Sequence, residues 1–276
     1  MPKTEINIVN YFGFRSSCTN FATTKQFVMN IHTRRTIRKY TSQDVPESLL
    51  QQLLASASRT QTMGNLQLYS VVVTRDQAMK KRLAPAHFNQ PMVTEAPVVL
   101  TICADFRRTT DWCTARDADA GYDNFLSFIN AATDALLFTQ TFCNLAEDEG
   151  LGCCFLGTTV YMPQQIIDVL QLPQLVMPVA TITLGWPDEE PPLTDRLTTE
   201  AFVHQETYMP FTPQRINHLY AAKEELAENK EFVRINCKSN LAQVFTDCRY
   251  TRRDNEAMSE GLLTALRRQG FLPPLP

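Results

Sequence analysis

The sequence lacks the patterns that mark membrane spans, exported proteins and zinc sites. It has no run of 18 consecutive apolar residues, so we expect no membrane-spanning helix. Its first 28 residues lack a basic start followed by an apolar core, which argues against a signal peptide. The eight cysteines form no Cys-x-x-Cys pair, and we interpret most of them as buried thiols of a protein in the reducing cytoplasm. A redox role for the vicinal Cys153 and Cys154 stays open.

Motifs for phosphate loops, serine nucleophiles and metal sites are missing as well. Neither GxxxxGK[ST] nor GxSxG occurs, and the four histidines stand singly, so we expect no metal site and no side-chain nucleophile. The stretch EGLGCCFLG at 149–157 nearly matches the glycine fingerprint of dinucleotide-binding folds. Its glycines end a predicted helix and lead into a predicted strand, the reverse of the order that this fingerprint requires. The sequence therefore argues against a Rossmann site.

The composition is that of a globular protein with a substantial core. The chain has 276 residues, of which 44% are hydrophobic and 20% charged, with a formal net charge of -3. This slightly acidic balance argues against a general nucleic-acid binder. We interpret residues 1–28 as an N-terminal extension, either poorly ordered or an over-extended reading of the start, and residues 29–276 as the folded domain.

Apolar periodicity predicts a mixture of strands and helices. The predicted strands are 68–76, 96–105, 153–157 and 176–187. The predicted helices are 45–58, 76–84, 124–150, 162–172, 212–229 and 255–270. Helices and strands do not alternate strictly, which indicates an α+β fold with a sheet of four to five strands. The longest predicted helix is apolar on nearly all sides, so we expect it to be central, and we expect 187–210 to be irregular.

The segment HTRRTIRKYT at 32–41 concentrates positive charge in this slightly acidic chain. Three arginines and one lysine lie within six positions, and no carboxylate lies among them. Arg34 and Arg38 share a face if the segment is helical, and guanidinium groups match pairs of phosphate oxygens. Thr36 adds a hydroxyl donor. The pattern predicts either a phosphate-binding segment or a solvated cationic surface.

Four stretches, taken in order, resemble the FMN-dependent nitroreductase family. RRTIRKYTSQDVPESLLQQLLASASRTQTMGNLQLYSVVVTRD is similar to the opening of that family: a basic motif, a helix, a small-residue loop and a strand. The other three resemble its larger, NADPH-preferring nitroreductase and FMN reductase subgroup: LGCCFLGTTVYMPQQIIDVLQLP, ATITLGWPDEEPPLTDRL and FVHQETY. The similarity extends from about residue 30 to residue 220.

The resemblance implies a fold, a cofactor and a reaction. The fold would be a nitroreductase-like three-layer arrangement, with a central mixed or antiparallel sheet flanked by helices, in an intertwined homodimer with FMN at the interface. NADPH, or NADH, would donate hydride to FMN N5, and a nitroaromatic, quinone or flavin acceptor would take the two electrons, with no nucleic-acid or membrane partner. Two alternatives stay open: a flavin reductase that supplies free reduced flavin, and a non-catalytic module that binds a phosphate-containing ligand.

The resemblance also assigns roles to individual residues. The FMN phosphate and ribityl chain would be bound by four residues, Arg34, Arg35, Thr36 and Arg38. The three arginines would be cations without acidic partners in the protein. Further flavin contacts would come from Thr62, Gly64, Gln90, Phe155, Leu156, Gly157, Thr158 and Arg196.

The sequence departs from the family pattern at three positions, one of which, Thr36, replaces a usual serine but keeps the hydroxyl. Thr158 replaces a usual glycine, and Thr194 replaces a usual lysine near the flavin. Beyond the matched stretches, the basic residues Lys230, Arg234 and Lys238 either meet the 2′-phosphate of NADPH or form a solvated surface.

Overall fold

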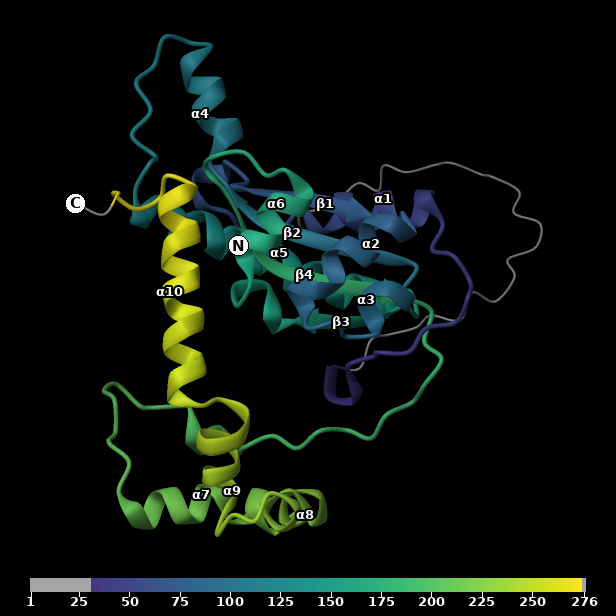
Figure 1. The fold of residues 1–276 in the computed structure, drawn as a ribbon, viewed down its shortest axis with the longest axis vertical. Coiled ribbons are helices and arrows are strands. Elements are labelled where there is room, and N and C mark those ends of the chain that lie inside the picture. The colour runs from purple at the N-terminus through teal and green to yellow at the C-terminus, as the bar shows by residue number, and fades with distance from the viewer. Residues whose placement is uncertain (1–30, 275–276) are drawn as a thin grey trace, which may run out of the picture.

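The centre of the fold is an antiparallel sheet of four strands in the order β1-β2-β4-β3, as the computed structural model shows over residues 31–274 (Figure 1). The strands are β1 Tyr69–Thr74, β2 Val98–Asp105, β3 Gly152–Leu156 and β4 Val176–Gly185. All four lie where the sequence predicted strands, and the antiparallel form of the predicted sheet is confirmed. The predicted N-terminal extension lies outside the described residues.

The two middle strands form the core of the sheet. Every residue of β2 and of β4 is buried, because helices cover both faces. The register between these strands shifts after Ile102, so that Cys103 pairs with Pro178. A proline has no N–H to give to the ladder, and an irregularity is where it disturbs a central strand least.

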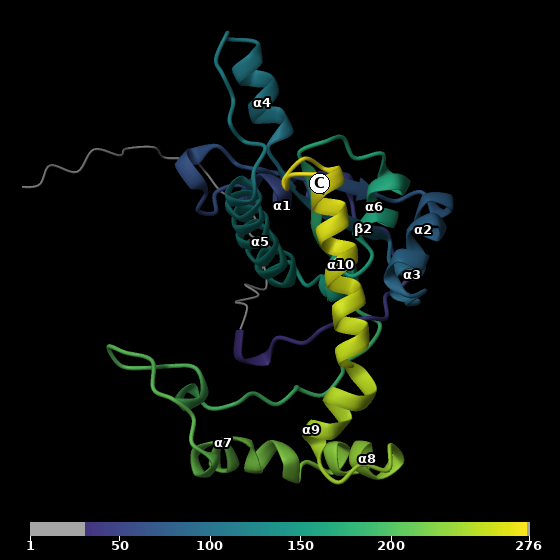
Figure 2. The same cartoon turned by 60° about the vertical axis from the view of Figure 1, so that its left-hand side comes forward.

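Helices lie on both faces of this sheet, which confirms the three-layer arrangement. The long helix α5, Phe125–Asp148, covers one face and packs against α1, Glu47–Ala57. The other side carries α2 Gln77–Leu83, α3 Met92–Glu95 and α6 Pro163–Leu170. Figure 2 shows α5 on one side of the sheet and α2, α3 and α6 on the other.

The second half of the chain leaves the sheet and returns to it. The remaining helices are α4 Arg107–Thr114, α7 Pro213–Glu225, α8 Ala227–Ile235, α9 Leu241–Val244 and α10 Arg252–Arg268. Single turns of 3-10 or π-helix are Ile31–Thr33, Met63–Asn65, Ala84–His87, Gly157–Val160, Thr199–Ala201 and Phe245–Arg249. The helices α7, α8 and α9 stand apart from the sheet, and α10 runs back towards it (Figures 1 and 2).

One prediction about helices was wrong. The predicted helix 212–229 is two helices, because Leu226 takes an extended conformation with ψ 134° that ends α7 before α8 begins. The helix α5 is central, as its apolar composition predicted, because it packs against both the sheet and α1. Among the described residues, large apolar side chains of one of its faces are exposed: Leu126, Ile129, Leu136 and Leu137. Within the described part of the chain, no helix is both long and apolar enough to cross a membrane.

Candidate functional site

The cationic segment 34–41 lies against β3 and against the chain that follows β4. The backbone N–H of Ile37 donates to the Cys153 carbonyl at 3.1 Å, and the N–H of Thr41 donates to the Trp186 carbonyl at 2.9 Å. Through these bonds the segment runs along the edge of the sheet as non-helical chain. The predicted phosphate-binding residues are therefore fixed beside the strand that leads into Phe155–Thr158.

Two paired glycines allow this close approach. Gly152 and Gly185 face each other across β3 and β4. A Cβ on Gly152 would lie 2.6 Å from the Cβ of Ile37, and a Cβ on Gly185 would lie 2.8 Å from Cδ1 of Tyr40. Both contacts are shorter than real carbon contacts, so a side chain at either position would push the cationic segment away.

Two of the predicted free cations have carboxylate partners, so this part of the prediction was wrong. Arg34 Nη1 lies 3.4 Å from Glu147 Oε1 of α5, and its Nη2 donates to Thr36 Oγ1 at 3.5 Å. Arg35 Nη2 lies 3.5 Å from Glu190 Oε1. Burial raises the pKa of the Glu147 carboxyl, and the Arg34 charge opposes that rise. The acidic partners come from distant parts of the chain.

Arg38 differs from these two arginines. Its side chain is exposed, and no carboxylate of residues 31–274 forms an ion pair with it. Burial raises the pKa of the Cys154 thiol on β3, while the nearby Arg38 charge opposes the rise. The backbone N–H groups of Arg38 and Lys39 both donate to Glu189 Oε1, at 2.5 and 3.0 Å. The backbone is thus held by Glu189, while the guanidinium lies near the Cys154 thiol and has no carboxylate partner among residues 31–274.

A buried carboxylate holds the loop that carries Thr62 and Gly64. Asp134 of α5 is only 1% exposed, and its two oxygens accept from the N–H groups of Met63 at 2.9 Å and Leu68 at 3.1 Å. Gly64 has φ +54°, which a residue without Cβ adopts at little cost. Asp134 has no signature in the sequence, because it lies in an otherwise ordinary apolar helix.

The two predicted halves of the site are attached to different parts of α5, one near its middle and the other at its C-terminal end. Asp134 holds the Thr62 loop and Glu147 pairs with Arg34, and these two acids are 13 positions apart in one helix. At 1.5 Å per residue the two anchor points are about 20 Å apart. The two acids thus hold the Thr62 loop and Arg34 at different levels of the same helix.

A second pair of predicted segments does meet. His87 Nδ1 and Thr158 Oγ1 are hydrogen-bonded at 2.8 Å, and the Gln90 N–H donates to the His87 carbonyl at 3.1 Å. Along the stretch Phe155–Thr158, Phe155 and Gly157 are exposed whereas Leu156 and Thr158 are buried. His87 is fully buried, and this burial lowers its pKa to about 4. In the sequence, His87 was one of four isolated histidines, and no pattern around it indicated a role.

The low pKa of His87 predicts a loss of stability in mild acid. An unfolded chain binds a proton at His87 near pH 6.5, whereas the folded chain does so only near pH 4. Between these values the unfolded state binds more protons, so the free energy of unfolding falls as pH falls, by up to about 3 kcal/mol. Denaturant unfolding between pH 7 and pH 4.5 measures this. His87→Gln, which does not titrate, is expected to flatten the profile, and parallel profiles would contradict the assignment.

The remaining predicted residues lie on the irregular segment and on the outer helices. The Arg196 guanidinium donates to Thr194 Oγ1 at 2.6 Å and to the Asp195 carbonyl at 2.7 Å, and within the described chain no bond joins it to the 34–38 segment. The candidates for NADPH phosphate each have an acidic partner: Lys230 with Glu225, Arg234 with Glu231, and Lys238 with Asp247. This pairing favours the solvated-surface interpretation of those three residues.

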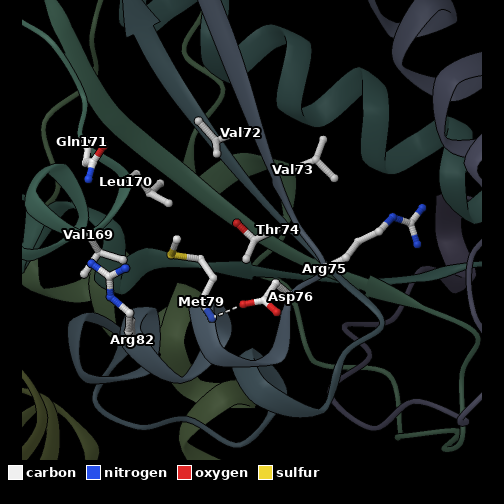
Figure 3. A pocket seen from close by; sticks show the side chains of 10 residues that line it. All are labelled: Val72, Val73, Thr74, Arg75, Asp76, Met79, Arg82, Val169, Leu170 and Gln171. Atoms are coloured by element: carbon white, nitrogen blue, oxygen red, sulfur yellow. Dashed lines mark hydrogen bonds between the residues drawn. The ribbon is translucent and has the colours of Figure 1, made fainter.

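A separate hollow of about 390 Å³ lies between β1, α2 and the end of α6. Its walls include Val72, Met79 and Leu170, and Figure 3 shows Arg75 extending away from these apolar side chains. Asp76 instead turns back to accept from the Met79 N–H at 2.8 Å. None of the predicted flavin contacts lines this hollow, so it is distinct from the candidate site.

Comparison with known proteins decides the family. The model of the Nitroreductase family matches residues 31–186. The chain belongs to the nitroreductase family. The FMN reductase (NAD(P)H) of Bacillus subtilis is 30% identical over 205 residues, which cover 74% of this chain and 82% of that protein. The oxygen-insensitive NADPH nitroreductase of Salmonella typhimurium is 30% identical over 194 residues, or 70% of this chain and 78% of that protein.

A solved structure extends the likeness over nearly the whole described chain. A Bacteroides fragilis protein, provisionally described as an oxidoreductase, superposes with a TM-score of 0.87 and is 59% identical, covering 88% of this chain and 98% of that one. The family recognised from the four sequence stretches is thus confirmed. In this nitroreductase the departures at Thr158 and Thr194 both carry side-chain hydrogen bonds, to His87 and Arg196.

Proposed function

We propose that this nitroreductase is an FMN-dependent NAD(P)H oxidoreductase that passes two electrons to nitroaromatic, quinone or flavin acceptors. The observation that carries the proposal is the exposed guanidinium of Arg38, held beside β3 and the Phe155–Thr158 stretch without an acidic partner among the described residues. Family membership supports it, and the two curated relatives are named as an FMN reductase and an NADPH nitroreductase. A cytoplasmic location stays a prediction.

The residues present fit FMN. An exposed arginine suits a phosphate, and Thr36 lies within 3.5 Å of Arg34 to complete a donor group. A Cβ at Gly157 would meet nothing within 4 Å, so the backbone there is open to a planar ring, and Phe155 beside it is 48% exposed. Bound FMN would supply the hydride chemistry. The chain's own residues bind the phosphate, orient the ring and leave one side open to substrates.

We further propose an intertwined homodimer. The exposed apolar face of α5 comprises Leu126, Ile129, Leu136 and Leu137, whose exposed fractions range from 41% to 68%. An apolar face of this kind is typical of a protein interface. Within one chain, the Asp134 anchor of the Thr62 loop and the Glu147 partner of Arg34 are about 20 Å apart along α5, so the Thr62 loop of a second copy would complete the site of the first. A dimer therefore accounts both for the exposed face and for the separated halves of the site.

The proposal predicts a coloured, active protein. We expect about one FMN per chain after reconstitution, and NADPH oxidation that requires both FMN and an electron acceptor. Absorption spectra and titration measure the binding, and steady-state rates with free FMN or with nitrofurazone as acceptor separate a flavin reductase from a nitroreductase. Absence of flavin binding would contradict the proposal. Binding without NAD(P)H oxidation would favour a non-catalytic module.

A further inference from the structure

The turn that presents Gln90 has a costly backbone conformation. Phe88 and Asn89 lie in the left-handed region, with φ 54° and 52°, and neither is a glycine. Two such residues in succession persist only where surrounding contacts determine them, and such segments often position functional groups. The contacts that hold this turn therefore bear on where Gln90 lies.

His87 is the residue that connects the turn to the rest of the protein. Its carbonyl accepts the Gln90 N–H at 3.1 Å, and its fully buried imidazole bonds to Thr158 Oγ1 at 2.8 Å. The other ring nitrogen, Nε2, is buried and has no hydrogen-bond partner within the described part of the chain. Thr158 is thus the one side-chain anchor of this imidazole among those residues.

Thr158 is itself part of a fixed segment. It lies in the single helical turn Gly157–Val160 that follows β3 directly. The hydroxyl of the next residue, Thr159, donates to the Leu156 carbonyl at 2.9 Å and lies within hydrogen-bond distance, 3.0 Å, of the Thr181 hydroxyl of β4. The backbone that carries Thr158 is therefore held against the central sheet through Thr159, and the Thr158 hydroxyl gives the His87 turn a fixed point of attachment.

We propose that the hydrogen bond between His87 and Thr158 is a positioning device that fixes Gln90 relative to the Phe155–Thr158 backbone and thereby sets the affinity and reduction potential of FMN. The inference rests on the proposed function. A glycine at 158, usual where this sequence has threonine, has no side chain to form the bond. The buried side chains of His87 and Thr158 bond to each other, so in this inference both are positioning residues that act through Gln90 and the backbone at 155–158.

The test uses substitutions at position 158 in the full chain. Thr158→Val keeps the shape but removes the hydroxyl, and we expect FMN to bind about tenfold more weakly because a buried partner is left unpaired. The ratio of dissociation constants for oxidised and reduced FMN should also change by about tenfold, which is about 30 mV for a two-electron couple. Thr158→Ser, which keeps the hydroxyl, is expected to restore both values.

A matched control separates positioning from stability. Thr139→Val removes a buried hydroxyl that bonds only within α5, to the Ala135 carbonyl at 2.7 Å, so it should change the melting temperature without changing the FMN potential. If Thr158→Val leaves both the FMN affinity and the FMN potential unchanged, the inference is overturned, whether or not the melting temperature falls. The proposed function would not be affected by that result. Failure of the wild-type protein to bind FMN would overturn the proposed function and this inference together.

Discussion

Replacing Arg38 with alanine is expected to weaken FMN binding by about 2–4 kcal/mol, or roughly 30- to 1,000-fold. The reason is the loss of a charge-assisted bond from a guanidinium that has no acidic partner in the described chain. Arg38→Lys keeps the charge but loses the planar fork, so its loss should be intermediate. Fluorescence titration of FMN gives the dissociation constants. Retention of wild-type affinity by Arg38→Ala would refute the phosphate-binding role.

Two further variants make this measurement specific. Arg34→Ala removes the partner of the half-buried Glu147, so we expect it to lower stability and to affect FMN binding less directly than the Arg38 change. Arg252→Ala removes the same charge from α10, where the side chain is 89% exposed, and is expected to leave FMN affinity unchanged. Equal losses in all three variants would indicate a general effect of net charge rather than a phosphate site.

Strongly patterned elements could be predicted from the sequence, and weakly patterned ones could not. Three of the four strands are apolar runs rich in β-branched residues, β3 is a short apolar run without them, and tertiary burial agrees with these local signals. The helix α4 was missed because RRTTDWCT has no apolar stripe. Arg108 holds it in place by donating to backbone carbonyls of the 66–69 loop, among them Tyr69 at 3.3 Å. Such a contact has no signature in a local window.

The same limit applies to the candidate site. The arginines of 34–38 were visible as a local cluster, and the family resemblance gave them a role. Their acidic partners were not visible, since Arg34 meets Glu147 across 113 residues of sequence and Arg35 meets Glu190 from a segment predicted to be irregular surface. Asp134 and His87 escaped notice for a similar reason. Each is a single polar residue in an apolar setting, and only the fold reveals which segment it holds.

Mixing two defective variants is expected to restore FMN sites if each site is built from two chains. Arg38→Ala damages the phosphate half, and Thr62→Trp blocks the loop half, where the threonine makes no capping hydrogen bond that the fold needs. In a twofold dimer of one chain of each kind, one site carries both changes and the other carries neither. Random exchange makes half the dimers mixed, so about a quarter of all sites should regain wild-type affinity.

The parent variants and one matched pair provide the controls. Each parent alone is expected to show no tight site, and two affinity tags on the co-refolded chains verify that mixed dimers form. Mixing Gly157→Trp with Arg38→Ala should restore no tight site. Gly157 directly follows β3, the strand beside Arg38 of the same chain, so each site of a mixed dimer would still carry one of the two changes. Mixed dimers of Arg38→Ala and Thr62→Trp that recover no tight site would refute the shared site. The exposed face of α5 would then need a different explanation, because a second chain covering that face would not complete the flavin site.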